Sequence, residues 1–389
     1  MSWLLFCLGV GSLGLTLNGL FPRRWWPIRA LSFLVQVFAA EMAVWIALWG
    51  TVAGVWLALG TDALKAWPGQ VGALAGVAAL AVSGWQVVLA WGTREQVAAV
   101  LKAAGLPDPA FDSRWRRAFL PRWVQGDGIE CVPDLRYAEG RGSRRLLDVW
   151  RPAGGASGAP VLLQIHGGAW FMGSKRAQGR PLLTRMARAG WVCVAINYRL
   201  SPGVRFPAHL VDCKLALKWI REHIAEYGGD PSRVVVTGGS AGGHLATLVA
   251  LTANNPRYQP GFESTDTSVL GAASIYGPFD IDAVLEHTGP KLRVWAKRLI
   301  FDDRSAEASP ITHVRPGLPP MLVVQGTADN LVPAPLAHRF VEKMRAAQNE
   351  VVHLEVSRAA HAFDVFFSLR SEAVGSGVQR FLEKLAARG

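Results

Sequence analysis

One short stretch constrains the fold of this chain more than any other. The apolar residues 234–236 run directly into the sequence GGSAGG at positions 238–243, which predicts a buried strand that turns sharply into a helix. Glycine is needed at Gly238 and Gly242, because a Cβ atom at either position would prevent the turn from closing. The turn holds the Ser240 hydroxyl above the end of the sheet, where a base can reach it. The stretch therefore predicts a serine nucleophile on a G-x-S-x-G elbow.

The chain after residue 129 has the pattern expected around such a turn, because short apolar segments alternate with segments of helical periodicity. We expect strands at 129–137, 145–151, 161–165, 191–198, 234–237, 270–276, 321–325 and 351–356, and helices at 211–227, 335–347 and 376–387. Buried strands that alternate with helices predict an α/β domain over residues 129–389, with a mostly parallel central sheet covered by helices.

A glycine-rich loop, His166-Gly167-Gly168-Ala169-Trp170, follows the expected strand 161–165. Attack of a serine on an acyl group creates an oxyanion, which needs backbone N–H donors that already point at it. We expect Gly167, Gly168 and Ala241 to supply these donors. His166 is expected to brace the loop rather than act as a base. The alternative is an ordinary glycine-rich turn, which the elbow in the same chain disfavours.

A base and an orienting carboxylate are expected late in the chain. Asp329 follows the expected strand 321–325, and His361 follows the last expected strand. The order Ser240, Asp329, His361 is typical of one serine-hydrolase class and differs from the order in the others. The competing histidines are His209, His244, His287, His313, His338 and His353, and the competing acids are Asp302, Asp303 and Asp364.

Three further motifs accompany these residues: NYRLSP at 197–202, FPA at 206–208 and YGGDP at 227–231. With the elbow, the glycine-rich loop, Asp329 and His361, they make the chain resemble the α/β-hydrolase superfamily. Within it, the chain is similar to the hormone-sensitive-lipase-like and carboxylesterase group, which includes arylacetamide-deacetylase-like, prenylcysteine-methylesterase-like and mycobacterial lipase/esterase-like proteins. The resemblance implies hydrolysis of carboxylic esters without a cofactor. Ala169 stands where a third glycine is common, and Gly239 stands where an acid often precedes the serine.

The first 105 residues have a different composition and are expected to form a helical transmembrane region. Apolar segments near 3–21, 31–59 and 71–91 are long enough to cross a bilayer. No small-residue cleavage site follows the first segment, so it resembles an anchor rather than a signal peptide. Its glycines (Gly9, Gly11, Gly14 and Gly19) allow close helix contact. Glu41 interrupts the second segment. Two explanations of this acid remain open: it has a functional role, or it accepts a hydrogen bond from a serine or threonine within the bundle.

The charge pattern predicts an orientation for this region. Arg23, Arg24 and Arg29 lie between the first two apolar segments, whereas only Lys65 lies between the second and the third. The positive-inside rule therefore places the domain after residue 105 on the cytoplasmic side of a multi-pass membrane protein. The net charge is +12, but the sequence lacks the motifs of nucleic-acid-binding proteins. A lipid bilayer is the expected partner.

Two segments are candidates to cover the active site. Aromatic residues recur every four positions in segment 106–128, at Phe111, Trp115, Phe119 and Trp123, with arginines between them. This segment is expected to be an amphipathic helix on the membrane surface or a cap over the site. An insertion near 254–320 is expected to cover an acyl pocket with an apolar stripe made of Phe279, Ile281, Val284, Leu285, Trp295, Leu299, Ile300 and Phe301.

The sequence therefore predicts an enzyme that hydrolyses apolar esters or lipids through an acyl-enzyme on Ser240. A thioesterase, a deacetylase and an amidase remain open, because they use the same groups. A non-catalytic scaffold on this fold would be expected to have lost one of these residues, and a transporter would be expected to have more buried charge than Glu41 alone. We expect no metal site and no cofactor, because no cysteine or histidine spacing typical of metal ligands is present.

Overall fold

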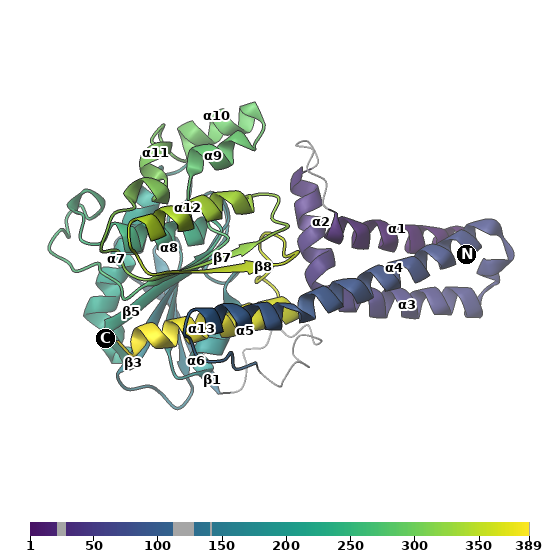
Figure 1. The fold of residues 1–389 in the computed structure, drawn as a ribbon, viewed down its shortest axis with the longest axis horizontal. Coiled ribbons are helices and arrows are strands. Elements are labelled where there is room, and N and C mark those ends of the chain that lie inside the picture. The colour runs from purple at the N-terminus through teal and green to yellow at the C-terminus, as the bar shows by residue number, and fades with distance from the viewer. Residues whose placement is uncertain (22–28, 112–127, 141, 389) are drawn as a thin grey trace.

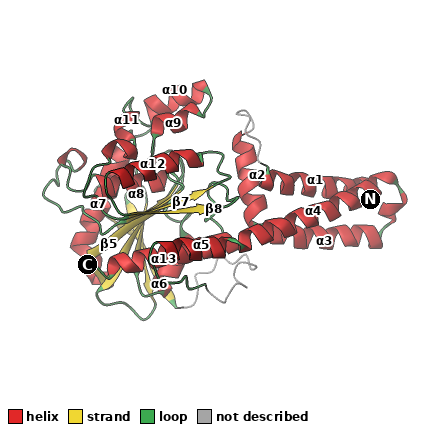
Figure 2. Cartoon of the chain, in the orientation of Figure 1, coloured by secondary structure: helices red, strands yellow, loops and turns green. Residues whose placement is uncertain are grey.

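The computed structural model describes residues 1–21, 29–111, 128–140 and 142–388 (Figure 1). A slender bundle of N-terminal helices extends from one side of a larger domain (Figure 2). Every strand among the described residues lies in this larger domain. The helix expected around Trp115, Phe119 and Trp123 falls outside the described residues, as do Arg23 and Arg24.

An eight-stranded sheet forms the centre of the larger part, in the order β1-β2-β4-β3-β5-β6-β7-β8. The strands are β1 (Ile129–Arg136), β2 (Leu146–Pro152), β3 (Ala159–Ile165), β4 (Val192–Ile196), β5 (Gly229–Gly239), β6 (Ala272–Ile275), β7 (Met321–Gly326) and β8 (Val351–Val356). The pairs β1–β2 and β2–β4 are antiparallel, and every other pair is parallel. This sheet confirms the predicted α/β class.

Helices cover both faces of the sheet because successive side chains of a strand point to opposite faces. Val161, Leu163 and Ile165 of β3 belong to a core with the first set of helices, and Leu162 belongs to a core with the second. The first set is α7 (Ala208–His223), α8 (Ala241–Leu251) and α12 (Ala334–Ala346), and the second is α6 (Arg180–Arg188), α13 (Leu369–Ala386) and α5 (Thr93–Ala103).

The last helix begins earlier than the sequence predicts. We expected it to start at residue 376, but α13 starts at Leu369. Ser368 is its N-cap, and its hydroxyl accepts a hydrogen bond from the backbone N–H of Ser371 in a capping box. Such a cap stabilises the first turn by about 1 kcal/mol. The additional turns bring Arg370 into the helix, and α6 was not predicted at all.

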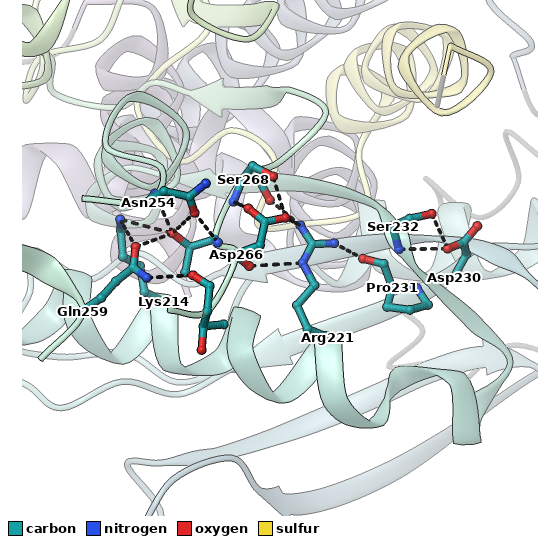
Figure 3. Close-up of polar contacts among 11 residues, drawn as sticks. Lys214, Arg221, Asp230, Pro231, Ser232, Asn254, Gln259, Asp266 and Ser268 are labelled. Carbon is teal, nitrogen blue, oxygen red and sulfur yellow. Dashed lines mark hydrogen bonds and ion pairs between the residues drawn. The ribbon is translucent and has the colours of Figure 1, made fainter. Parts of the chain in front are cut away.

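The predicted cap insertion at 254–320 is smaller than expected. Residues 254–268 lie against α7, where Lys214 and Arg221 donate hydrogen bonds to the backbone carbonyls of Thr252, Pro231, Asp266 and Ser268 (Figure 3). Strand β6 then takes a central place in the sheet. Only α9 (Ile281–Glu286), α10 (Pro290–Leu299) and α11 (Ser305–Ala308) remain as candidates to cover the site.

Most of the expected apolar stripe of this insertion packs into the core instead of lining a pocket. Phe279, Ile281, Leu285, Ile300 and Phe301 are buried in the core on the α8 face of the sheet. The Phe279 ring stacks on Phe340 of α12, with ring centroids 4.2 Å apart. Leu292 and Val294 of α10 are exposed instead.

Three apolar helices form the N-terminal bundle: α1 (Ser2–Leu20), α3 (Ala43–Gly60) and α4 (Trp67–Trp91). Two helical stretches, Ser2–Leu20 and Trp67–Ala103, are long and apolar enough to cross a membrane. The second includes α4 and α5, so it runs from the bundle onto α13 (Figure 1). Glycines Gly9 and Gly72 let α1 and α4 touch, because a Cβ on Gly9 would lie 1.9 Å from the Gly72 oxygen. Gly11 and Gly14 face open space.

The second predicted span, 31–59, is not one straight helix. It is divided into α2 (Arg29–Glu41) and α3, and the two parts meet at 83°. Helix α2 lies across the end of the bundle that faces the sheet (Figure 1). The helix turns at Met42 next to the Glu41 carboxylate, which pairs with Arg370 of α13. With the bent pair counted as one span, three segments of the described chain are long enough to cross a membrane.

Candidate active site

The elbow between β5 and α8 holds Ser240 in a conformation that few residues other than glycine adopt. Its φ is 58° and its ψ is −125°, and its N–H donates to the carbonyl of Ile275 at 2.9 Å. A Cβ on Gly238 would lie 2.5 Å from the carbonyl carbon of Gly242, and a Cβ on Gly242 would lie 2.1 Å from the Ile165 oxygen. Backbone strain of this kind persists only where the surrounding packing enforces it. The two glycines are therefore required by the turn.

The structure brings Ser240, His361 and Asp329 together in one hydrogen-bonded row. The Nε2 atom of His361 lies 2.8 Å from the Ser240 Oγ atom, and its Nδ1 atom lies 2.7 Å from Asp329 Oδ2. Because a carboxylate can only accept, Nδ1 carries the proton and Nε2 is free to accept the serine hydroxyl proton. This is the arrangement in which a serine is activated by a histidine and an acid.

The carboxylate of Asp329 is fixed by four donors. Its Oδ1 accepts the backbone N–H groups of Leu331 and Val332, both at 2.8 Å. Its Oδ2 accepts from the Gln325 side chain at 3.1 Å as well as from His361. The loop after β7 thus wraps around the carboxylate and orients it toward the histidine. Gln325 was not identified from the sequence.

The glycine-rich loop after β3 lies beside the serine, but one predicted donor is already engaged. The N–H of Gly167 donates to Oε1 of Gln178 at 2.6 Å, so Gly167 does not present a free donor as expected. Within the described residues, the N–H groups of Gly168 and Ala241 have no acceptor. Gly168 has a φ of 119°, and a Cβ there would lie 2.2 Å from the Met172 oxygen. Ala241 begins α8, where the helix dipole favours negative charge.

Buried rings brace this loop. Ala169 and Trp170 have positive φ angles of 49° and 64°, and Trp170 Nε1 donates to His244 Nδ1 at 3.1 Å. His166 stacks on Tyr198 with ring centroids 4.4 Å apart, and the Tyr198 hydroxyl donates to the His166 carbonyl. Burial lowers the pKa of His166 to about 4. These contacts are those of a neutral bracing residue, not of a base.

The competing histidines lie elsewhere. The His209 ring meets the Ser201 hydroxyl at 3.1 Å, and the His244 ring meets the Ala308 carbonyl. His338, His353 and Glu355 offer ligand atoms within 4.8 Å of one another, so the structure places possible metal ligands together where the sequence predicted none. The cluster lies on α12 and β8, and His338 Nε2 lies 2.6 Å from Glu355 Oε1.

The competing acids differ in their surroundings. Asp302 forms an exposed ion pair with Arg205. Asp364 accepts a hydrogen bond from the hydroxyl of Tyr276, whose ring centroid lies 4.6 Å from that of His361. Removal from solvent raises the pKa of Asp364. A Cβ on Gly239 would lie 2.6 Å from the Tyr276 hydroxyl, so Tyr276 occupies the space beside Gly239, the position at which the resemblance led us to expect an acid.

Helix α2 of the N-terminal region also reaches this site, which the sequence did not predict. Its Phe33 ring meets the His361 ring edge to face at 5.9 Å between centroids. Gln36 donates to the carbonyl of Ala328, the residue before Asp329, at 3.2 Å. Glu41 is buried, and accepts from Arg370 at 2.8 Å and from Ser368 at 2.6 Å. The expected hydrogen bond between Glu41 and a serine therefore exists, but the donor is Ser368, which caps α13 and is not part of the bundle.

Comparison with known proteins places this geometry in a family. Residues 147–344 match the family described as BD-FAE. The chain is 44% identical over 264 residues to a "Probable carboxylic ester hydrolase LipM" and to an "Esterase LipQ", both of Mycobacterium tuberculosis, in alignments that cover 65% and 66% of this chain. These alignments span only 61% and 62% of the two relatives.

Solved structures agree with the sequence relatives. The butyrate-bound esterase Est2 of Thermogutta terrifontis superposes with a TM-score of 0.56 and is 28% identical, over 69% of this chain and 98% of that one. The match in sequence over the sheet and its loops, together with the match in fold, shows that the chain belongs to the BD-FAE family within the α/β-hydrolase carboxylesterase group.

Proposed function

We propose that the protein is a membrane-anchored serine hydrolase of apolar carboxylic esters. The single observation that supports it best is the row Ser240–His361–Asp329, with contacts of 2.8 Å and 2.7 Å. The names of the relatives LipM and LipQ describe ester hydrolases, which agrees with this geometry.

In the first half of the reaction, the Ser240 oxygen attacks the ester carbonyl carbon while His361 Nε2 removes the hydroxyl proton. The carbonyl oxygen becomes negative and accepts hydrogen bonds from the N–H groups of Gly168 and Ala241. Asp329 stabilises the imidazolium that forms. The tetrahedral intermediate then expels the alcohol, which takes the proton from Nε2, and an acyl-enzyme remains.

Water completes the cycle by the reverse sequence of proton transfers. His361 removes a proton from a water molecule, the resulting hydroxide attacks the acyl carbon, and the same N–H donors stabilise the second oxyanion. The carboxylic acid leaves when Ser240 regains its proton from Nε2.

Apolar side chains beside the glycine-rich loop favour an apolar substrate. Phe171 and Met172 are 42% and 56% exposed, which is unusual for such large apolar residues in this domain. Trp295 of α10 contacts Phe171 edge to face at 5.8 Å between centroids. Because butyrate is named as the ligand of the similar esterase Est2, butyrate esters are suitable first probes.

The proposal is tested by hydrolysis of p-nitrophenyl acetate, butyrate and octanoate with detergent-solubilised protein. Ser240→Ala should reduce kcat/KM by about 10³-fold or more, because the nucleophile is lost. Ser232→Ala replaces an exposed serine and should leave the rate unchanged. A Ser240→Ala protein as active as the parent would refute the assignment. Activity on thioesters or amides alone would redirect it to another acyl group.

The membrane anchor is part of the proposal and rests on separate observations. Two or three apolar segments are long enough to span a bilayer, and their outer surfaces expose large side chains such as Trp49, Trp56 and Leu59. Exposed Trp67 and Trp91 mark the two ends of α4, as aromatic residues at both membrane surfaces do. The arginines between the first two segments favour a cytoplasmic catalytic domain.

Carbonate extraction and cysteine labelling test this anchor. The protein should stay in the membrane pellet at high pH, and detergent should release it. In a background that replaces Cys7 and Cys131 by serine, which leaves only the buried cysteines Cys193 and Cys213, Asp62→Cys in the loop before α4 should react with an impermeant maleimide added to intact cells, and Ser232→Cys should not. The reverse labelling pattern would place the catalytic domain outside, and release by carbonate would refute the anchor.

A further inference from the structure

One face of α2 is committed to the hydrolase domain. Gln36, Val37 and Glu41 are at most 8% exposed, and Phe33 is partly buried against the core that contains α13. These positions follow the i, i+3, i+4, i+8 spacing of one helix face. Phe38 points away from this face and is 49% exposed. Helix α2 therefore has a buried face against the hydrolase domain and an outer face away from it.

Polar contacts fasten this face at its C-terminal end. The Glu41 and Arg370 side chains are each only 1% exposed, and their atoms meet at 2.8 Å. Ser368, which caps α13, donates to the second oxygen of the same carboxylate. A buried ion pair of this kind holds its two elements in one arrangement, because each charge left alone would be strongly unfavourable. The ion pair thus fixes where α2 lies.

The other end of the face lies beside His361. His361 can protonate the alcohol only if the alcohol oxygen is within hydrogen-bond reach of Nε2. Phe33 touches the ring that carries this nitrogen. The oxyanion donors lie on other elements: Gly168 is in the loop after β3, and Ala241 begins α8. The alcohol oxygen must approach the His361 ring, and Phe33 of α2 contacts this ring.

We propose that α2 forms the wall of the alcohol subsite, with Phe33 as its specificity-determining residue and the Glu41–Arg370 ion pair as the clamp that positions it. This inference rests on the proposed ester hydrolysis. It assigns a segment of the N-terminal helical region to substrate selection, with esters of compact apolar alcohols as the preferred class. Phe33 acts by contact with the alcohol, whereas Glu41 and Arg370 are positioning residues.

The wall is tested with two ester series on the full chain in detergent: acetates of ethanol, phenol and 1-naphthol, and p-nitrophenyl esters of acetate, butyrate and octanoate. Phe33→Ala should raise the ratio of kcat/KM for 1-naphthyl acetate over ethyl acetate about tenfold, because space opens on the alcohol side. The acyl-length profile should change by less than about twofold. Phe33→Leu should shift the ratio less, and Phe38→Ala should not shift it.

A second measurement, the rate of deacylation, distinguishes a role of Phe33 in alcohol binding from a general structural effect of its replacement. All acetates form the same acetyl-enzyme, so its hydrolysis involves no alcohol. The deacylation rate measured after a burst should therefore be the same in Phe33→Ala and the parent. An equal change in both ester series, or a changed deacylation rate, would overturn the alcohol wall while leaving ester hydrolysis established. Absence of Ser240-dependent hydrolysis in the parent would instead reject the proposed function.

The clamp has a readout that does not need activity. Glu41→Gln and Arg370→Met should each lower the thermal midpoint of the full chain in detergent, and the double variant should lose less than the sum of the two. Asp62→Asn, which removes one partner of an exposed ion pair, is the matched control and should have little effect. Additive losses would refute the clamp. In active protein, Glu41→Gln should reproduce the alcohol shift of Phe33→Ala, and lost stability without that shift would also refute it.

Discussion

The N-terminal helices and the hydrolase domain are stabilised in different ways. The domain buries many polar groups, among them Asp329, His361, Lys214 and Asp212, and each of these is hydrogen-bonded. Among the described residues, every large apolar side chain that is exposed lies in residues 1–91, except Phe171, Met172, Leu292 and Val294. The domain combines large apolar cores with buried polar groups that are hydrogen-bonded, whereas the bundle relies on apolar surface and close helix contact.

Helix α2 does not fit this division, and it shows where the two regions depend on one another. It lies between the apolar helices α1 and α3 in the chain, but its buried face carries Gln36 and Glu41. Gln36 and Glu41 accept or donate hydrogen bonds across to Ala328, Ser368 and Arg370 of the hydrolase domain. Ser32 of the same helix bonds instead to Asn18 of α1. An apolar segment can thus be recruited to an active site by two polar residues.

The largest expected effect is the loss of activity when the hydrogen bond between Asp329 and His361 is changed. Asp329→Asn should lower kcat about 10³–10⁴-fold, because an amide cannot hold the His361 tautomer that accepts the serine proton. The burst kinetics of p-nitrophenyl butyrate and labelling of Ser240 by a fluorophosphonate measure this loss. Asp302→Asn removes an exposed carboxylate and should leave both unchanged. Near-normal activity of Asp329→Asn would mean that another acid orients the histidine.

The second largest expected effect is a difference in stability loss between a glycine of the hydrolase domain and a glycine of the bundle when each is replaced by alanine. Gly242→Ala should destabilise the protein by about 3 kcal/mol, because its Cβ would lie 2.1 Å from a backbone oxygen. Gly14→Ala in α1 has open space around it and should be neutral or stabilise by up to about 1 kcal/mol, since alanine favours helix. Thermal unfolding in detergent compares the two variants. Equal losses would mean that the bundle is packed as tightly as the elbow.

The effect that is smallest per residue is acid sensitivity, which should be confined to the domain. Burial lowers the pKa of His166 and His209 to about 4 and that of His244 to about 3, from 6.5. Below pH 6.5 the unfolded chain therefore binds protons that the folded chain does not. The free energy of unfolding decreases as the pH is lowered. The loss should be on the order of 2 kcal/mol for each histidine at pH 5.

Hydrogen exchange at pH 7 and pH 5, corrected for intrinsic rates, measures where this loss occurs. Protection should fall in β3, α7 and α8, which carry or precede these histidines, before it falls in α1 and α4. His223→Gln, a change at an exposed histidine, should not alter the acid response, whereas His209→Gln should reduce it. Simultaneous loss of protection in the bundle would show that the two regions unfold as one unit.

Much of the site was predictable because its parts are local. The elbow, the glycine-rich loop and the loops that carry Asp329 and His361 each depend on a few consecutive residues, so their spacing in the sequence predicts their geometry. A contact within the turn, with Gly242, makes Gly238 necessary, whereas Gly242 is also required by the approach of Ile165 on the neighbouring strand β3. The order of strands and helices followed from hydrophobic periodicity in the same way.

The parts that could not be predicted depend on contacts between distant segments. Gln178 engages Gly167 and so removes one expected oxyanion donor, and Tyr276 fills the space beside Gly239. The start of α13 was missed because it depends on a serine cap that also binds Glu41. Glu41 and Arg370 are 329 positions apart, and nothing local links them.

The sequence by itself therefore determined the α/β class, the serine elbow with its acid and histidine, and the apolar character of the first helices. Only the tertiary structure decided that the segment 31–59 bends at Met42 and that α2 packs beside His361. The physical reason is the range of the interactions. Periodicity and turn sterics act over a few residues, whereas a buried charge selects its partner only after the chain has brought the two together.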